Sequence, residues 1–184
     1  LFSVGIYFSF WVNYYALIIA ALNSTLLVAY AKDLQKRFLI SNLIVSFLVG
    51  STFVFGGFAV ENFIPSLLLA LMAFSANTAR EIIKDLEDKE ADVTKGVNSV
   101  PVVLGRGKAR LLSSLFVIVA IALTPMPILL EIFGIKYGVT VILSIGVFAW
   151  SIFLIEQDEE SSKIQGMLKL GMILGLVAFL AGAF

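Results

Sequence analysis

Residues 137–155 read YGVTVILSIGVFAWSIFLI, an unbroken run without one charged side chain. As an α-helix this run would be about 28 Å long, close to the roughly 30 Å thickness of the hydrocarbon core of a bilayer. Its apolar residues do not alternate with polar ones, as the strands of a membrane β-barrel require. The run therefore predicts a membrane-spanning helix.

Six further apolar runs follow one another along the chain, separated by charged residues or by proline and glycine. They are residues 1–12, 16–31, 38–60, a run from 63 past 74, 111–124 and 167–184. Pro125 and Pro127 end the run at residue 124, because proline cannot continue a helix. The sequence thus predicts an all-α fold, a polytopic transmembrane bundle of six or seven helices.

Composition agrees with this fold and narrows the chemistry. Hydrophobic residues make up 60% of the chain and charged residues 14%, against about 45–50% and about 25% in soluble domains. The chain has neither cysteine nor histidine, which removes the thiolates, the commonest general base and the commonest transition-metal ligand. Carboxylates, amides, lysines and arginines are left to carry any function, and no nucleic-acid partner is expected.

The chain begins inside an apolar run rather than ahead of one. Residues 1–12 would cover about 18 Å as a helix, roughly half of a bilayer core. No basic residues precede them, as they would in a signal peptide. We therefore expect residues 1–184 to form a single transmembrane domain that is incomplete at its N-terminus, with Leu1 inside a helix whose beginning is missing.

Basic residues gather on one side of the predicted bundle. The loops alternate between two sides, and of the 13 lysines and arginines only Lys136 falls on the second side. Cytoplasmic loops carry such an excess of lysine and arginine. We therefore expect a multi-pass protein of the cell membrane whose working face is cytoplasmic.

The stretch at residues 77–109, NTAREIIKDLEDKEADVTKGVNSVPVVLGRGKA, holds the candidate chemistry. If the fourth apolar run continues as a helix, five polar side chains share a stripe about 80° wide. They are Asn77, Glu81, Asp85, Asp88 and Asp92, with Lys84 at the flank and Glu87 and Glu90 pointing away.

Like charges at this spacing repel by roughly 0.2–0.5 kcal/mol per pair, so a bound cation would explain the stripe. Oxygen ligands without histidine or cysteine favour Mg²⁺, Mn²⁺ or Ca²⁺. Mg²⁺ is commonly held by one or two carboxylates together with substrate phosphates, and lysine or arginine neutralises the remaining phosphate charge. The stripe predicts such a metal–phosphate site, and a wetted amphipathic helix without a ligand is the alternative.

Residues 80–92, of the pattern REIIKDxxDxxxD, resemble the second aspartate-rich motif of the UbiA-type prenyltransferase superfamily. Lys95-Gly96 and PVVLG at 101–105 extend the likeness, as do YAKDLQKR at 30–37 and Asn42 with VSFLVG at 45–50. The likeness runs through essentially all of the chain, as helices three to nine of a nine-helix fold.

The resemblance implies Mg²⁺-dependent transfer of an isoprenyl group from an isoprenyl diphosphate to a lipophilic acceptor among the membrane lipids. Asp85, Asp88 and Asp92 would be the catalytic and metal-binding residues. The implied diphosphate-binding residues are Lys32, Lys36, Arg37, Asn77, Arg80, Glu81 and Lys84, with Lys32 and Lys36 as alternatives to each other. The first aspartate-rich motif of the family is absent, so we expect activity to belong to a longer parent chain.

The placement of Asp85 three residues before Asp88 most resembles the archaeal branch, whose members transfer a geranylgeranyl group to geranylgeranylglyceryl phosphate in ether-phospholipid synthesis. An aromatic acceptor such as 4-hydroxybenzoate or a quinone precursor is the alternative. A cation transporter is an alternative of another class, although transporter sites lie near the bilayer midplane and these acids lie beyond a span. The CDP-alcohol phosphatidyltransferases require an Asp-Gly upstream of Ala79-Arg80, which the chain lacks.

Overall fold

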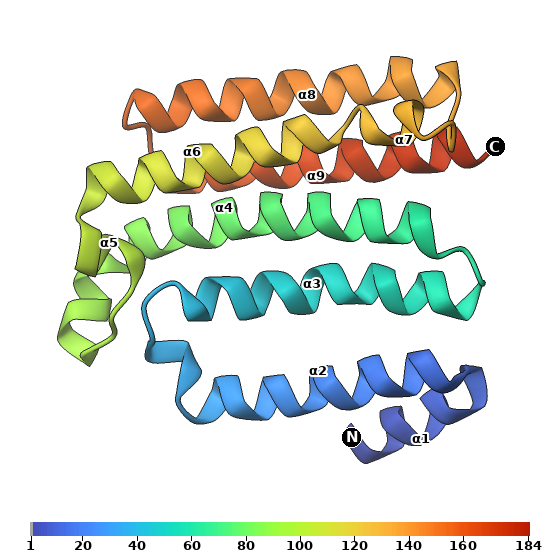
Figure 1. The fold of residues 1–184 in the computed structure, drawn as a ribbon. Helices are drawn as coiled ribbons and strands as arrows, with labels where there is room; N and C mark the ends of the chain where they lie inside the picture. The colour runs from blue at the N-terminus through green and yellow to red at the C-terminus, as the bar shows by residue number, and fades with distance from the viewer. Residues whose placement is uncertain (1) are drawn as a thin grey trace.

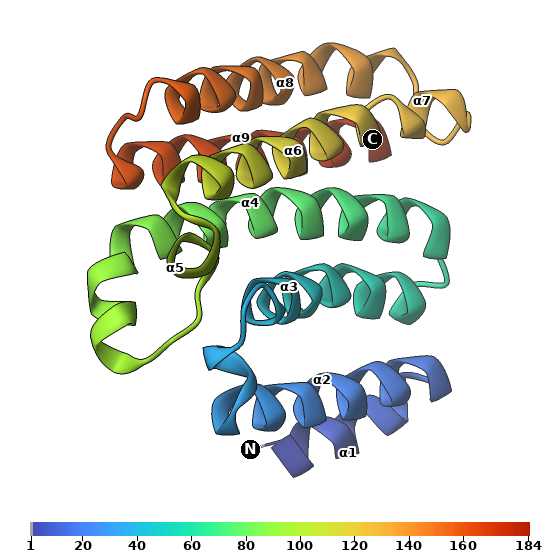
Figure 2. The ribbon, with the colours of Figure 1, turned by 60° about the vertical axis from the view of Figure 1, so that its left-hand side comes forward.

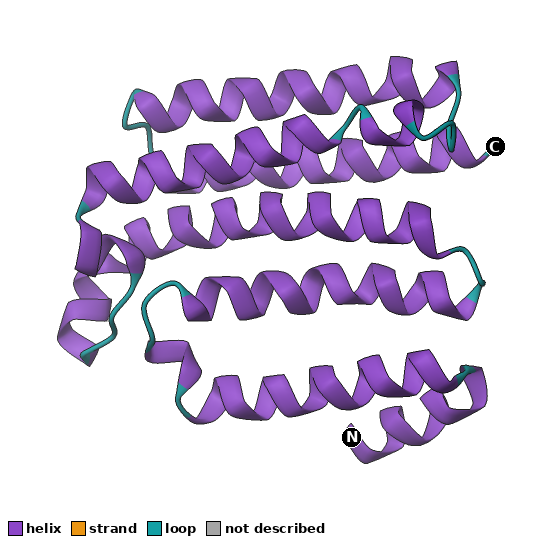
Figure 3. Ribbon diagram, viewed as in Figure 1, coloured by secondary structure: helices purple, strands orange, loops and turns teal. Residues whose placement is uncertain are grey.

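The computed structural model describes residues 2–184, and every regular element among them is a helix (Figure 1, Figure 3). The elements in chain order are α1 (Phe2–Val12), α2 (Tyr14–Lys32), the 3₁₀ helix η1 (Leu34–Lys36), α3 (Ile40–Ala59), α4 (Phe63–Lys95), α5 (Val100–Leu104), α6 (Arg106–Leu123), α7 (Met126–Leu129), α8 (Ile135–Glu156) and α9 (Ser161–Ala183). The predicted all-α fold is confirmed, while the prediction for Leu1 lies outside the described residues.

Six segments are long and apolar enough to cross a membrane, namely α2, α3, α4, α6 continued by α7, α8 and α9. The chain is therefore a multi-pass membrane protein, as predicted. Four helices begin earlier than their apolar runs, and the difference is largest for α6, at Arg106 rather than 111, and for α9, at Ser161 rather than 167. Hydropathy marks only the part of a helix that lies in lipid, whereas the backbone hydrogen bonds continue into water.

From one edge of the bundle, α1 and α2, then α3 and then α4 lie side by side in chain order (Figure 1, Figure 2). Both α6 and α9 then pack beside α4, and α8 forms the opposite edge, where it packs mainly against α9. The connections α2–α3, α4–α6 and α8–α9 share one end of the bundle, and the connections α3–α4 and α6–α8 share the opposite end. This alternation is the one expected from the loop charges.

The central helix, α4, fixes the position of the acidic stripe. One side of it is packed in the main apolar core, which includes Ala76, Ala79, Ile82, Ile83 and Leu86 from α4 and Val117, Phe148, Leu154 and Leu168 from α6, α8 and α9. Lipid chains are as apolar as these side chains, so close packing against α6, α8 and α9, rather than removal from water, gives the helix one preferred rotation. That rotation turns the acids away from the core.

Close packing between α3 and α4 depends on Gly50. A Cβ at this position would lie 2.9 Å from the carbonyl oxygen of Ala70, and a backbone atom in a helix cannot yield easily. We expect Gly50→Ala to lower the free energy of unfolding by about 1–3 kcal/mol, as overpacking usually does. Denaturant titration in detergent micelles measures the change.

The control for this prediction is Gly56→Ala in the same helix. Among the described residues a Cβ at Gly56 would meet nothing within 4 Å, so we expect a gain of roughly 0.5–1 kcal/mol from helix propensity alone. Equal stability of the two variants would contradict the close approach of α3 to α4 at Gly50.

Candidate functional site

A cavity of about 450 Å³ lies at the end of the bundle that carries the α2–α3 and α4–α5 connections. Side chains from α2, η1, α3, α4 and the segment after α4 surround it. They are Tyr30, Gln35, Lys36, Ser41, Asn42, Val45, Glu81, Lys84, Asp85, Asp88, Asp92, Lys95, Val97 and Ser99. Most of these are polar or charged, so the cavity is suited to a charged group.

The acidic stripe predicted on α4 is present. At 33 residues the helix is about 50 Å long, more than a bilayer core of roughly 30 Å requires, so its last turns extend beyond the membrane. Glu81, Asp85, Asp88 and Asp92 all line the cavity. Glu87 and Glu90 line a separate depression together with Lys89 and Arg106, which confirms that they point away.

A buried hydrogen-bond network holds Asp85 in place. The Nδ2 amide of Asn42, which is 3% exposed on α3, donates to Asp85 Oδ2 at 2.8 Å. One turn further along α3, the Ser46 hydroxyl donates to the carbonyl oxygen of Asn42 at 2.7 Å. Asn77 Nδ2 on α4 donates in turn to Ser46 Oγ at 3.2 Å. Because every member of this network has a partner, it sets the register of α3 against α4 beneath the acids.

Three lysines, Lys36, Lys84 and Lys95, contribute the positive charge of the cavity. Lys84 Nζ lies 3.7 Å from a carboxylate oxygen of Glu81. Neither Lys36 nor Lys95 takes part in any ion pair within residues 2–184. Two of the three ammonium groups are therefore uncommitted and available to an anionic ligand.

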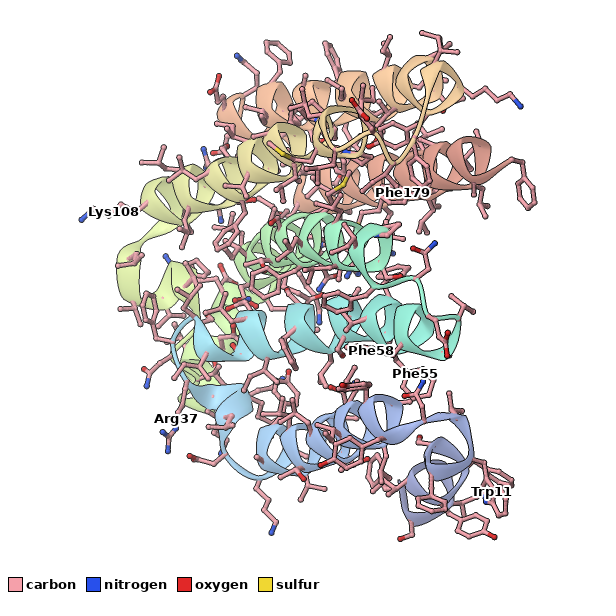
Figure 4. All side chains as sticks on the ribbon, turned by 45° about the vertical axis from the view of Figure 1, so that its right-hand side comes forward. Trp11, Arg37, Phe55, Phe58, Lys108 and Phe179 are labelled. Atoms are coloured by element: carbon pink, nitrogen blue, oxygen red, sulfur yellow. The ribbon has the colours of Figure 1, made fainter. Side chains whose placement is uncertain are left out.

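The remaining predicted diphosphate ligands lie elsewhere. Asn77 is buried in the network beneath the acids, and Arg80 pairs with Glu81 at 2.8 Å. Arg37 pairs with Asp33 and points outward from the end of the bundle (Figure 4). Lys32 ends α2 outside the lining of the cavity, so of the two alternative lysines the structure brings only Lys36 to the acids.

Asp85, Asp88 and Asp92 stand on successive turns of α4, with about 5–6 Å between neighbouring Cβ atoms at such spacings. Across residues 2–184 no three acidic side chains gather closely enough to hold a metal ion by themselves. Mg²⁺ needs less from the protein, because it is usually bound by one or two carboxylates and takes further oxygens from substrate phosphates and water. The donor set of the cavity, carboxylates with lysines beside them, fits Mg²⁺ bound together with a phosphorylated ligand.

Several lining residues were missed as site residues. Tyr30 and Asn42 belong to stretches that carried the family resemblance, but nothing in their spacing relates them to the acids on α4. Ser99 lies in a connection, where the sequence has no periodicity to place a side chain. Lys95 could have been found, since it follows Lys84 by three full helical turns and so shares its side of α4.

A second, apolar cavity of about 150 Å³ lies deeper in the bundle, bounded by α3, α4, α6, α8 and α9. Val49 on its wall follows Val45 of the charged cavity by one turn of α3. The bundle thus has a charged cavity at one membrane end and apolar space deeper inside. This combination suits a membrane protein that binds lipids with anionic headgroups.

Comparison with known sequences agrees with that class. The profile of the UbiA prenyltransferase family matches residues 1–181. The chain belongs to this family, and the resemblance seen in its motifs is thereby confirmed.

Individual relatives support the assignment. The digeranylgeranylglyceryl phosphate synthase of Methanopyrus kandleri is 40% identical over 181 residues, which cover 98% of this chain and 67% of that protein. The synthase of the same name from Methanocaldococcus jannaschii is 38% identical over 183 residues, 98% of this chain and 64% of that protein. The chain thus spans about two thirds of the length of these relatives.

A solved structure, described as giving structural and mechanistic insights into the biosynthesis of digeranylgeranylglyceryl phosphate synthase in membranes, has the same fold. It superimposes with a TM-score of 0.90 at 37% identity, covering 99% of this chain and 66% of that one.

Proposed function

We propose that residues 1–184 form one domain of an enzyme that transfers a geranylgeranyl group from geranylgeranyl diphosphate to geranylgeranylglyceryl phosphate. The observation that carries the proposal is the meeting of Asp85, Asp88 and Asp92 with Lys36 and Lys84 around one cavity at a membrane end. The names of the relatives favour this acceptor over an aromatic one. The clustering of lysine and arginine at this end supports a cytoplasmic active site.

The proposed reaction exchanges one carbon–oxygen bond for another. The bond between the first carbon of the prenyl chain and the diphosphate breaks, and the diphosphate keeps the electron pair. The acceptor hydroxyl attacks the allylic cation to form an ether, and its proton goes to the released diphosphate or to a carboxylate.

Each part of the site has a role in this reaction. Asp85, Asp88 and Asp92 would hold Mg²⁺, and the bound ion would supply positive charge to the leaving diphosphate. Lys36 and Lys84 stabilise the same charge through charge-assisted hydrogen bonds. Apolar side chains such as Val49, Phe53 and Met72 receive the prenyl chain and keep water from the cation.

The test is transfer from labelled geranylgeranyl diphosphate in detergent, with geranylgeranylglyceryl phosphate and 4-hydroxybenzoate offered separately. The longest natural form of the chain is used, because the relatives extend beyond the matched region. We expect product only with the glyceryl phosphate, and only while Mg²⁺ is present. Activity that is lost on chelation and returns when Mg²⁺ is added back shows that the metal was removed and that the protein was not inactivated.

Other outcomes have distinct meanings. Product with 4-hydroxybenzoate alone would keep the site and overturn the acceptor. An absence of transfer to both, together with Mg²⁺ flux into liposomes that carry the protein, would favour the transporter alternative.

A further inference from the structure

Lys84 and Lys95 flank the three aspartates of the acidic stripe on α4. They are 11 positions apart in the sequence, which is three helical turns and about 16 Å on the same side of the helix. Asp85, Asp88 and Asp92 lie between them, and all five side chains line the same cavity. A row of carboxylates with a lysine at each end can accommodate two anionic groups, one at each lysine, with metal between.

Ser99 provides an independent observation at the Lys95 end. The residue is 3% exposed and lines the cavity, yet its hydroxyl has no hydrogen-bond partner within residues 2–184. Leaving a buried hydroxyl unpaired costs about 1–3 kcal/mol. A bound anion that accepts a hydrogen bond from this hydroxyl would remove the cost.

The segment that carries both residues is held in place by its backbone. Gly96 ends α4 in the left-handed conformation with φ of 66°, and its N–H bonds back to the carbonyl oxygens of Asp92 and Val93. The N–H of Asn98 donates to the carbonyl oxygen of Lys36 at 3.0 Å. These bonds hold the turn that carries Lys95 and Ser99 next to Lys36. Both residues therefore have defined positions beside the cavity, as a binding site requires.

We propose that Lys95 and Ser99 bind the phosphate monoester of the lipid acceptor, next to the donor diphosphate at Lys36 and Lys84. This inference rests on the proposed function, because a phosphorylated acceptor is what brings a second anion into the cavity. The acceptor hydroxyl must approach the carbon that carries the diphosphate, so a phosphate on the neighbouring glycerol carbon enters the same cavity. Lys95 beside the acceptor phosphate, and Lys36 and Lys84 beside the donor diphosphate, offset the repulsion between the two anions.

The test is the steady-state kinetics of Lys95→Gln and Ser99→Ala with the full natural chain. We expect Lys95→Gln to raise the KM for geranylgeranylglyceryl phosphate about tenfold, the loss expected for one charge-assisted hydrogen bond. The KM for geranylgeranyl diphosphate stays within about twofold, because its own cations are intact. We expect Ser99→Ala to raise the acceptor KM by a smaller factor. Lys95→Arg keeps the positive charge, so its acceptor KM stays close to that of the wild type.

Two controls make the result specific. Lys89→Gln removes the same charge from the same helix, but Lys89 lines the other depression with Arg106, so its kinetics match the wild type. Geranylgeranylglycerol, the acceptor without its phosphate, is used equally by the wild type and Lys95→Gln. Unchanged thermal unfolding of the variants excludes a general loss of structure.

The failures of the two proposals are distinguishable. If the wild type transfers to the glyceryl phosphate but Lys95→Gln behaves as Lys89→Gln, or if the donor KM rises instead, the acceptor site alone is overturned. If the wild type does not use the glyceryl phosphate, the proposed function fails and the acceptor site with it.

Discussion

We expect Asp88→Asn and Asp92→Asn each to reduce prenyl transfer by about 10²–10³-fold, the loss typical of removing one preorganised charge-stabilising group from an active site. Both carboxylates line the cavity on successive turns of α4. Asparagine keeps the size of the side chain and the helix but removes the negative charge that we propose holds Mg²⁺. The measurement is the rate of transfer as a function of Mg²⁺ concentration, and we expect half-maximal activity of both variants to require more Mg²⁺.

Glu90→Gln is the matched control for these two variants. It removes a carboxylate from the same turns of α4, but Glu90 lies in the depression on the other side of the helix. We expect its rate to stay within about twofold of the wild type, as for surface substitutions in general. The metal-binding role of the stripe is contradicted if Asp88→Asn responds to Mg²⁺ as Glu90→Gln does.

We expect Lys36→Gln to raise the KM for geranylgeranyl diphosphate by about 10- to 100-fold, because a hydrogen bond to a charged group contributes about 1.5–3 kcal/mol. Lys36 lines the cavity and makes no ion pair with any described residue. Its ammonium group is therefore available to the diphosphate. The measurement is the KM of each substrate varied separately at saturating Mg²⁺.

Lys32→Gln is the comparison for this second prediction, since the sequence alone left Lys32 and Lys36 equivalent. Lys32 lies outside the lining of the cavity, so we expect the KM of Lys32→Gln for the diphosphate to differ from that of the wild type by less than about twofold. A larger effect at Lys32 than at Lys36 would show that the connection between α2 and α3 is arranged differently when substrate is bound.

The sequence by itself determined the membrane bundle, the alternation of its loops and the acidic stripe on α4. These features follow from local rules: hydropathy over a bilayer thickness specifies a span, and a period of 3.6 residues places Glu81, Asp85, Asp88 and Asp92 on one side of any helix through them. No knowledge of neighbouring helices is needed for either inference. The family resemblance of residues 80–92 added the chemistry.

The tertiary structure alone decided which other residues meet that stripe. Asn42 reaches Asp85 across 43 positions of sequence, Arg80 pairs with Glu81, and Lys36 rather than Lys32 faces the cavity. The physical reason is that such contacts depend on how α3 is rotated and shifted against α4. Packing at Gly50 and the buried bonds of Ser46 and Asn77 set that register, and no local pattern in either helix encodes it.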